Sequence, residues 1–153
     1  MIEAGSAAPD FTLSDQDGES VSLSDFRRQT VVLVFYQADF SSVCTDQLSV
    51  YQEMLSELEG HGVKLLGISV DGTFCHKAFG DHLNLGFPLL ADFHPKGAVS
   101  LAYGVWSEEY GTSNRALVMV DPDGDVQWSY MSPPLEVPGA NLIFDALDQR
   151  TAA

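Results

Sequence analysis

The pattern of apolar positions is clearest between residues 30 and 58. Residues 30–36 are an almost unbroken run of β-branched and aromatic side chains, which predicts a strand buried on both faces. After a polar stretch, apolar residues recur in steps of four and three, which places them on one face of an α-helix. These positions are Cys44, Leu48, Tyr51, Leu55 and Leu58. The pattern therefore predicts a buried strand that turns into a long helix, which ends near Gly60 or Gly62.

The other apolar runs and turn signals complete the order of elements. Residues 63–70 predict a second buried strand, so that strand, helix and strand form a βαβ unit with parallel strands. The remaining predicted elements are a hairpin of 11–13 with 20–23, a capped turn at 24–28, a helix at 74–83, a strand at 87–90, a small helix opened by 92–95 and continuing through 98–103, a loop at 105–113, a hairpin of 114–120 with 126–131, a connector at 132–138 and a helix at 141–149. This order predicts an α/β fold: a thioredoxin-like α/β sandwich whose central mixed sheet is flanked by helices, with an added N-terminal β-hairpin.

Length and composition indicate one domain spanning residues 1–153. The sequence has 153 residues, 45% of them hydrophobic, which is enough for a single substantial core. No run approaches the roughly 18 apolar residues of a membrane-spanning helix, so we expect no membrane partner. The first residues lack the basic start and apolar segment of a secretory signal. The 2 cysteines form neither a disulfide framework nor a zinc pattern, and the 4 histidines share no ligand spacing. We therefore expect a cytoplasmic protein without a metal.

The charge of the chain is strongly acidic. There are 22 Asp and Glu residues against 7 Lys and Arg, a formal net charge of −15. A nucleic-acid partner is excluded by this balance, because the phosphate backbone would be repelled. The acidic residues are scattered and form no tail, which argues against a disordered segment. We interpret the charge as adaptation to high salt, where counterions screen self-repulsion; an ordinary acidic cytosolic protein is the alternative.

Cys44 falls in the first turn of the predicted helix, and Ser41 and Ser42 before it are both good N-cap residues. A helix N-terminus offers unpaired N–H groups and a partial positive charge, which favour a thiolate. A thiolate is the nucleophile of cysteine chemistry. Because Cys44 also lies on the apolar face of the helix, it is alternatively a small buried hydrophobic residue. Asp39 is interpreted as a charge that favours the helix dipole.

Residues 35–45 resemble the active-site segment of peroxiredoxins, in which a proline, three residues, a threonine and two residues precede the peroxidatic cysteine. Further segments resemble the family in the same order along the chain, so that the likeness covers about residues 3–149. These segments are 67–71, 76–79, 87–92, 103–105 and 115–121. The resemblance is closest to the alkyl hydroperoxide reductase E-like branch, whose members largely work with one cysteine.

The resemblance implies a thiol-dependent peroxidase that reduces hydrogen peroxide or organic hydroperoxides without a cofactor. Cys44 would attack a peroxide oxygen and become a sulfenic acid. Arg115 matches the family's active-site arginine, and the hydroxyl of Ser41 would bond to the thiolate or the peroxide. Tyr36, Gln37 and Val43 would line the site, with backbone N–H groups near Val43 adding stabilisation. The family also implies an external thiol or thioredoxin-like reductant and a homodimer or larger homo-oligomer.

Two residues depart from the family pattern. Gln37 stands where the family has proline, which returns a backbone N–H and a polar side chain, and Ser41 stands where it has threonine, which keeps the hydroxyl and removes a methyl. These departures keep a second function open, a redox sensor or relay with little peroxidase turnover. Cys75 is open as well: it either resolves the sulfenic acid by forming a disulfide with Cys44, or is a bystander thiol.

The high-salt interpretation predicts a dependence of stability on ionic strength. We expect the melting temperature to rise between low and molar KCl, because the screening length falls to about 3 Å at 1 M and weakens the repulsion among acidic residues. A thermal melt followed by circular dichroism at increasing KCl measures this. An unchanged melting temperature would favour the alternative, an ordinary acidic protein.

Overall fold

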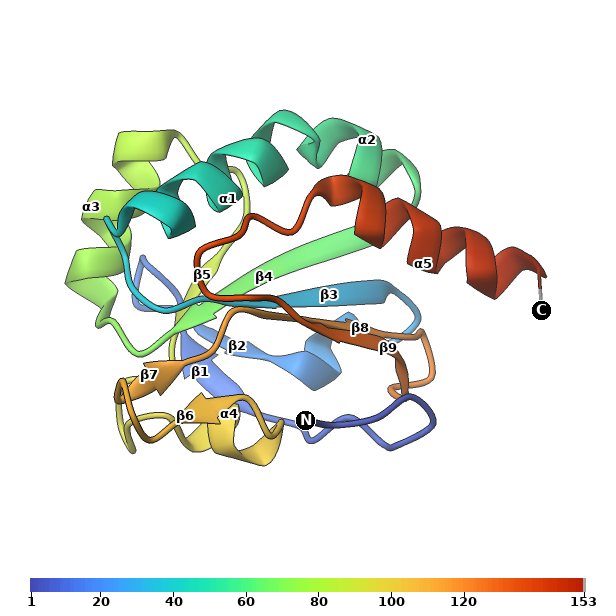
Figure 1. The fold of residues 1–153 in the computed structure, drawn as a ribbon, viewed down its shortest axis with the longest axis horizontal. Helices are drawn as coiled ribbons and strands as arrows, with labels where there is room; N and C mark the ends of the chain where they lie inside the picture. Colours follow the sequence, from blue (N-terminus) through green and yellow to red (C-terminus); the bar gives the residue numbers. More distant parts are fainter. Residues whose placement is uncertain (153) are drawn as a thin grey trace.

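The fold is built on one seven-stranded mixed sheet, with strand order β2-β1-β5-β4-β3-β8-β9. The computed structural model describes the backbone of residues 1–152 and the side chains of residues 1–149. In order, the elements are β1 (Thr12–Ser14), β2 (Ser20–Ser22), a 3-10 turn (Leu23–Phe26), β3 (Thr30–Phe35), α1 (Ser42–Glu53), α2 (Leu55–Gly60), β4 (Val63–Ser69), α3 (Thr73–Leu83), β5 (Leu89–Ala91), α4 (Ala98–Ala102), β6 (Trp106–Ser107), β7 (Thr112–Ser113), β8 (Ala116–Val120), β9 (Val126–Met131) and α5 (Ala140–Ala152) (Figure 1). Among the described residues, no helix is both long and apolar enough to cross a membrane.

β3 lies at the centre of the sheet, as its apolar run predicts. It pairs in parallel with β4 and antiparallel with β8, and all six of its residues are buried. β4 pairs in parallel with β5, and β8 pairs antiparallel with β9. The N-terminal hairpin of β1 and β2 extends the sheet through an antiparallel pairing of β1 with β5. The predicted α/β class, the βαβ unit and the added hairpin are therefore confirmed.

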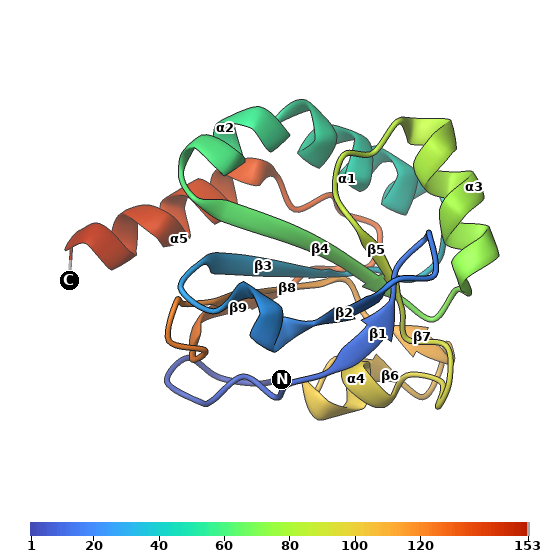
Figure 2. The same ribbon diagram turned by 180° about the vertical axis from the view of Figure 1, so that it is seen from behind.

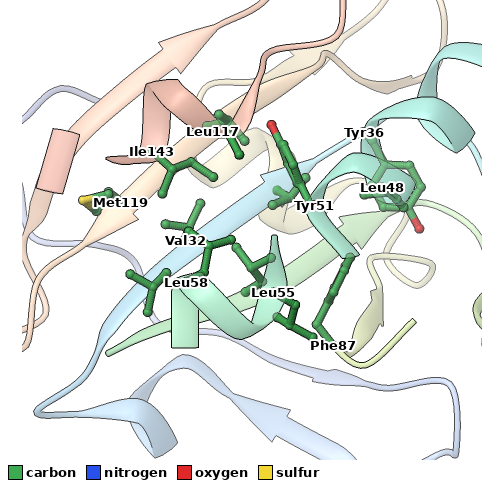
Figure 3. Close-up of a cluster of buried hydrophobic side chains, with 14 of the residues drawn as sticks. Val32, Tyr36, Leu48, Tyr51, Leu55, Leu58, Phe87, Leu117, Met119 and Ile143 are labelled. Carbon is green, nitrogen blue, oxygen red and sulfur yellow. The ribbon is translucent and has the colours of Figure 1, made fainter. Parts of the chain in front are cut away.

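The sheet has a hydrophobic core on each face because successive residues of a strand point to opposite sides. Val32 and Val34 pack with α1, α2, α3 and α5 on one face, while Val31 and Leu33 pack on the other face with the segment around α4. Figures 1 and 2 show α1, α2, α3 and α5 above the sheet, and α4 with the β6–β7 hairpin below it. Figure 3 shows part of the first core, with Leu58 of α2 beside Val32 of β3, and Leu48 of α1 beside Tyr36.

Several boundaries differ from the predicted ones. The long helix is interrupted at Met54, whose N–H is shared between the carbonyls of Val50 and Tyr51, so that α1 and α2 are separate helices. The loop predicted at 105–113 contains the short hairpin of β6 and β7, and the helix predicted from 92–95 onward begins only at Ala98. The turn predicted at 24–28 begins earlier, because Asp25 accepts a hydrogen bond from the N–H of Ser22 in a capping box.

A buried polar cluster fastens the loop after β3 to the neighbouring elements. Asp39 accepts a hydrogen bond of 2.6 Å from the Tyr36 hydroxyl and one of 2.7 Å from His76 Nδ1, and its side chain and that of His76 are 0% exposed. His76 Nε2 donates to the carbonyl of Leu90 at 3.1 Å. Both ring nitrogens of His76 therefore have an oxygen partner within the protein. The Asp39 N–H donates to Asp71 Oδ2 at 2.9 Å. The Asp39 side chain therefore links the loop after β3 to His76 of α3, and His76 in turn contacts β5. We assign Asp39 this structural role in place of the expected interaction with the helix dipole.

Removing the carboxylate of Asp39 tests the importance of this cluster. We expect Asp39→Ala to lower the free energy of unfolding by about 2–6 kcal/mol, because it leaves two buried polar groups, the imidazole of His76 and the Tyr36 hydroxyl, without their hydrogen-bond partner. Urea denaturation followed by circular dichroism measures the change. Asp46→Ala is the matched control: it removes the same charge from an exposed position, where a change within about 0.5 kcal/mol is expected. Equal midpoints for the two variants would contradict the role of the cluster.

Candidate active site

Cys44 lies in the first turn of α1, at the point where the chain leaves the centre of the sheet. Ser41 occupies the N-cap position with an extended backbone, as predicted, and its carbonyl accepts the N–H of Thr45 at 2.9 Å. The Ser41 hydroxyl, however, donates to the carbonyl of Ala38 at 2.9 Å and makes no capping hydrogen bond, so the side-chain part of the capping prediction is wrong. Cys44 itself is 0% exposed in the isolated chain.

Arg115 reaches the cysteine from the start of β8. Its Nη1 lies 3.3 Å from Cys44 Sγ and donates to Gln47 Oε1 at 2.6 Å, while Nε and Nη2 donate to the carbonyl of Pro134 at 3.2 and 3.1 Å. The residue is 2% exposed. Within the part of the chain whose side chains are described, no carboxylate oxygen lies within 4.0 Å of this guanidinium. A buried charge is expensive unless it is paired, so the sulfur is the one neighbour able to supply the opposite charge.

A second pair of side chains holds the arginine in place. Gln47 Nε2 donates to the Tyr51 hydroxyl at 3.2 Å, and that hydroxyl donates to the carbonyl of Pro138 at 2.7 Å. Burial raises the pKa of Tyr51 to about 12, which keeps the hydroxyl protonated and able to donate. Sequence reasoning missed Gln47. Its signal is a polar residue three positions after Cys44 and four before Tyr51, on the helix face that is otherwise apolar.

The sulfur has a second side-chain neighbour in Gln37. The Cys44 thiol donates to Gln37 Oε1 at 3.3 Å. Beside Gln37 a cavity of about 670 Å³ opens to the surface, and three of the predicted site residues, Gln37, Ser41 and Val43, line it. The other lining residues are Ser42, Tyr110, Thr112, Arg115, Pro133, Pro134, Leu135 and Glu136. The walls are mostly apolar.

Tyr36 does not line this cavity. It is fully buried, its ring lies 6.5 Å from that of Phe79, and its hydroxyl donates to Asp39. Burial and the carboxylate of Asp39 raise the pKa of Tyr36 well above its usual value, so this hydroxyl stays protonated. Tyr36 therefore supports the loop that carries Gln37 from within the core.

Cys75 lies in the first turn of α3 and is a free thiol, like Cys44. Burial and the carboxylates of Asp39 and Asp71 raise the pKa of the Cys75 thiol to about 11. Ligand atoms of Asp39, Asp71 and Cys75 lie within 4.8 Å of one another, a spacing that a cation could use. Hydrogen bonds already engage these carboxylates, since Asp39 binds Tyr36 and His76, and Asp71 accepts from Ser69 at 2.6 Å. The group is thus explained as part of the buried polar cluster.

Known proteins resemble this chain both in sequence and in structure. Residues 4–129 match the model of the AhpC/TSA family. The chain is 40% identical over 153 residues to alkyl hydroperoxide reductase E of Mycobacterium tuberculosis, covering 99% of this chain and 100% of that protein. It is 40% identical over 130 residues to chloroplastic peroxiredoxin Q of Triticum aestivum, covering 84% of this chain and 59% of that one. The crystal structure of Enterococcus faecalis AhpC superposes with a TM-score of 0.91 at 26% identity, over 99% of this chain and 94% of the other. The chain therefore belongs to the AhpC/TSA family, the peroxiredoxins.

Proposed function

We propose that this protein is a thiol-dependent peroxidase that reduces hydrogen peroxide or organic hydroperoxides with Cys44 as the nucleophile. The observation that carries the proposal is the contact of 3.3 Å between Cys44 Sγ and Nη1 of the buried Arg115. This guanidinium has Gln47 Oε1 and the Pro134 carbonyl as its other acceptors, which are neutral. A negative sulfur completes the pairing, and a thiolate is the form that attacks a peroxide.

The reaction requires positioning and charge stabilisation more than proton chemistry. The thiolate attacks one peroxide oxygen, the O–O bond breaks, and the sulfur becomes a sulfenic acid. The second oxygen leaves with the bonding electron pair and takes a proton to become water or an alcohol. Arg115 donates hydrogen bonds to the oxygens as this charge develops. In this proposal the unpaired N–H groups in the first turn of α1, which carries Cys44, add stabilisation.

An external thiol completes the cycle in this proposal. A reductant thiolate attacks the sulfenic sulfur, which forms a mixed disulfide and releases water, and a second thiol then frees Cys44. Cys75 is poorly suited to this step because its pKa is raised to about 11, so its thiol is almost entirely protonated at neutral pH. The apolar cavity lined by Gln37 and Arg115, the two side-chain neighbours of Cys44, supports the approach of both a peroxide and an external partner.

The setting of the reaction follows from the surface of the chain. The net charge of −15 supports our proposal that the protein works in a cytoplasm with a high salt concentration. The exposed rings of Phe74 and Phe93, at 92% and 62% exposure, support a homodimer or larger homo-oligomer in which a second copy covers them. The Phe93 ring lies close to Gly72, two residues before Phe74, so the two aromatic residues belong to neighbouring segments.

Stopped-flow tryptophan fluorescence with hydrogen peroxide and an alkyl hydroperoxide tests the peroxidase. We expect oxidation thousands of times faster than that of a free thiol, and its complete loss in Cys44→Ser. Arg115→Lys keeps the charge but loses the bidentate fork, and we expect a rate about 100-fold lower, within the range for removing one stabilising donor. Arg28→Ala removes an arginine that is exposed and outside the cavity, and it should react like the unaltered chain.

The same measurement separates the peroxidase from a redox sensor or relay. A second-order rate no better than that of a free thiol would eliminate the enzyme and leave the sensor. Arg115→Lys is preferred over Arg115→Ala because the latter opens a void among Cys44, Gln47 and Pro134 and risks the fold. Thermal melts of each variant establish that the lost rate is a lost interaction and not lost structure.

The role of Cys75 is tested by its labelling with iodoacetamide across pH, in the Cys44→Ser background. With a pKa of about 11, about one Cys75 thiol in 10,000 is ionised at neutral pH, so labelling should be slow there and rise about tenfold per pH unit. Asp71→Asn removes one of the carboxylates that raise this pKa, and we expect faster labelling at neutral pH. Turnover with an external thiol should persist in Cys75→Ser. A change of mobility on a non-reducing gel after stoichiometric peroxide, absent in Cys75→Ser, would instead assign the resolving role to Cys75.

A further inference from the structure

Two side-chain carboxamides lie at the active site, and they are held very differently. Gln47 is fixed at both ends, since Oε1 accepts from Arg115 at 2.6 Å and Nε2 donates to the Tyr51 hydroxyl at 3.2 Å. Gln37 has a single hydrogen bond among the described side chains, the one from the Cys44 thiol at 3.3 Å. The amide of Gln37 can therefore turn about its terminal bond without breaking any other contact of this kind. That torsion has a broad, roughly twofold profile, so the two orientations of the amide are similar in intrinsic energy.

The backbone on each side of Gln37 is firmly held. The Tyr36 N–H donates to the carbonyl of Ile68 at 3.1 Å, and Asp39 is anchored to Asp71 and His76. The reach of the Gln37 side chain is thus set by the sheet, and only its end is adjustable. Gln37 also lines the cavity, so this residue borders both the sulfur and the space from which we expect a peroxide to approach.

The chemistry of the sulfur changes what it needs from this neighbour. A thiol donates a hydrogen bond, and Gln37 Oε1 accepts it, as in this structure. A thiolate has no hydrogen to donate, so an oxygen facing it is repelled, whereas Nε2 would donate to it. The sulfenic acid formed by the reaction again carries an O–H, which Oε1 can accept. The Arg115 guanidinium has only hydrogen-bond donors, so it cannot accept a hydrogen bond from a thiol or a sulfenic acid.

We propose that Gln37 is a further catalytic residue, whose amide turns with the state of Cys44. It donates from Nε2 to the thiolate and to the attacked peroxide oxygen, and it accepts at Oε1 from the sulfenic hydroxyl. The donor adds to the stabilisation of the attacking form, and the acceptor keeps the sulfenic acid neutral and less reactive toward a second peroxide. This role rests on the proposed peroxidase function, and it belongs to the position where the family resemblance places a proline, which has no side-chain donor.

Three measurements on Gln37 variants test the proposal, all in the Cys75→Ser background so that one thiol is followed. Gln37→Leu is similar in size and has neither donor nor acceptor, while Gln37→Glu keeps the acceptor, loses both donors and places a charge near the sulfur. We expect the rate with hydrogen peroxide to fall about 10-fold to 100-fold in Gln37→Leu and further in Gln37→Glu, as for the loss of a hydrogen bond to a charged group. Labelling of Cys44 by iodoacetamide at neutral pH should slow in the same order.

The third measurement follows the sulfenic acid, the form that the proposed acceptor holds. Mass spectrometry after increasing peroxide gives the fraction of Cys44 driven from sulfenic to sulfinic acid. We expect Gln37→Leu, which lacks the acceptor, to reach sulfinic acid at several-fold lower peroxide than the unaltered chain. A role in structure alone would not produce this shift. Gln29→Leu, at an exposed position outside the cavity, is the control and should leave all three measurements unchanged.

The outcomes distinguish this inference from the function on which it rests. If the unaltered chain reacts no faster than a free thiol, the proposed function fails. If the unaltered chain is fast and Gln37→Leu, with an unchanged melting temperature, matches it within about twofold, only the role of Gln37 is overturned. If Gln37→Leu has a lower melting temperature, the rates at which iodoacetamide labels Cys44 in Gln37→Leu and Gln37→Glu are compared. The proposal requires labelling to be slower in Gln37→Glu, and equal rates would overturn it.

Discussion

The site depends on one buried positive charge that no carboxylate in the described part of the chain neutralises. Arg115 is 2% exposed and is surrounded by a thiol, an amide oxygen and a backbone carbonyl. These groups come from α1 and from the segment after β9, so the guanidinium joins parts of the chain that are distant in sequence. The dipoles of these groups stabilise the positive charge but leave it unpaired. An unpaired charge costs more free energy in a medium of low dielectric constant than in water. Among these neighbours, Cys44 Sγ is the atom that the proposed function makes negative.

The two cysteines show that a helix N-terminus alone does not decide reactivity. Cys44 and Cys75 are each the third residue of their helices, α1 and α3, so the helix dipole acts on both in a similar way. Their neighbours differ: Cys44 lies against a guanidinium, while Cys75 lies near the carboxylates of Asp39 and Asp71, which together with burial raise its pKa. The same backbone position thus has a guanidinium beside the sulfur in one helix and carboxylates beside it in the other, and the side chains around each cysteine make the difference.

The sequence predicts those features that depend on local pattern. The apolar run of residues 30–36 and the spacing of the helix after it were sufficient for the central strand, the βαβ unit and the place of Cys44. The pairing of Asp39 with His76 could not be read in this way, because the residues are 37 positions apart and each alone is an ordinary polar side chain. The break at Met54 and the short β6–β7 hairpin likewise follow from tertiary packing, which has no local signal. Arg115 was found through family resemblance, whereas Gln47, which fixes its orientation, required the structure.

The acidity of the surface and the chemistry of the site are nearly independent of each other. A peroxide is a neutral molecule, so a net charge of −15 neither attracts nor repels it, and the buried Arg115 acts only at contact distance. The reduction half of the cycle is different, because an external thiol reacts as an anion and must approach a strongly negative molecule. The surface charge therefore bears on the second step and leaves the first untouched. High salt, which shortens the range of the repulsion to about 3 Å at 1 M, would favour both the folded state and the return of Cys44 to its reduced form.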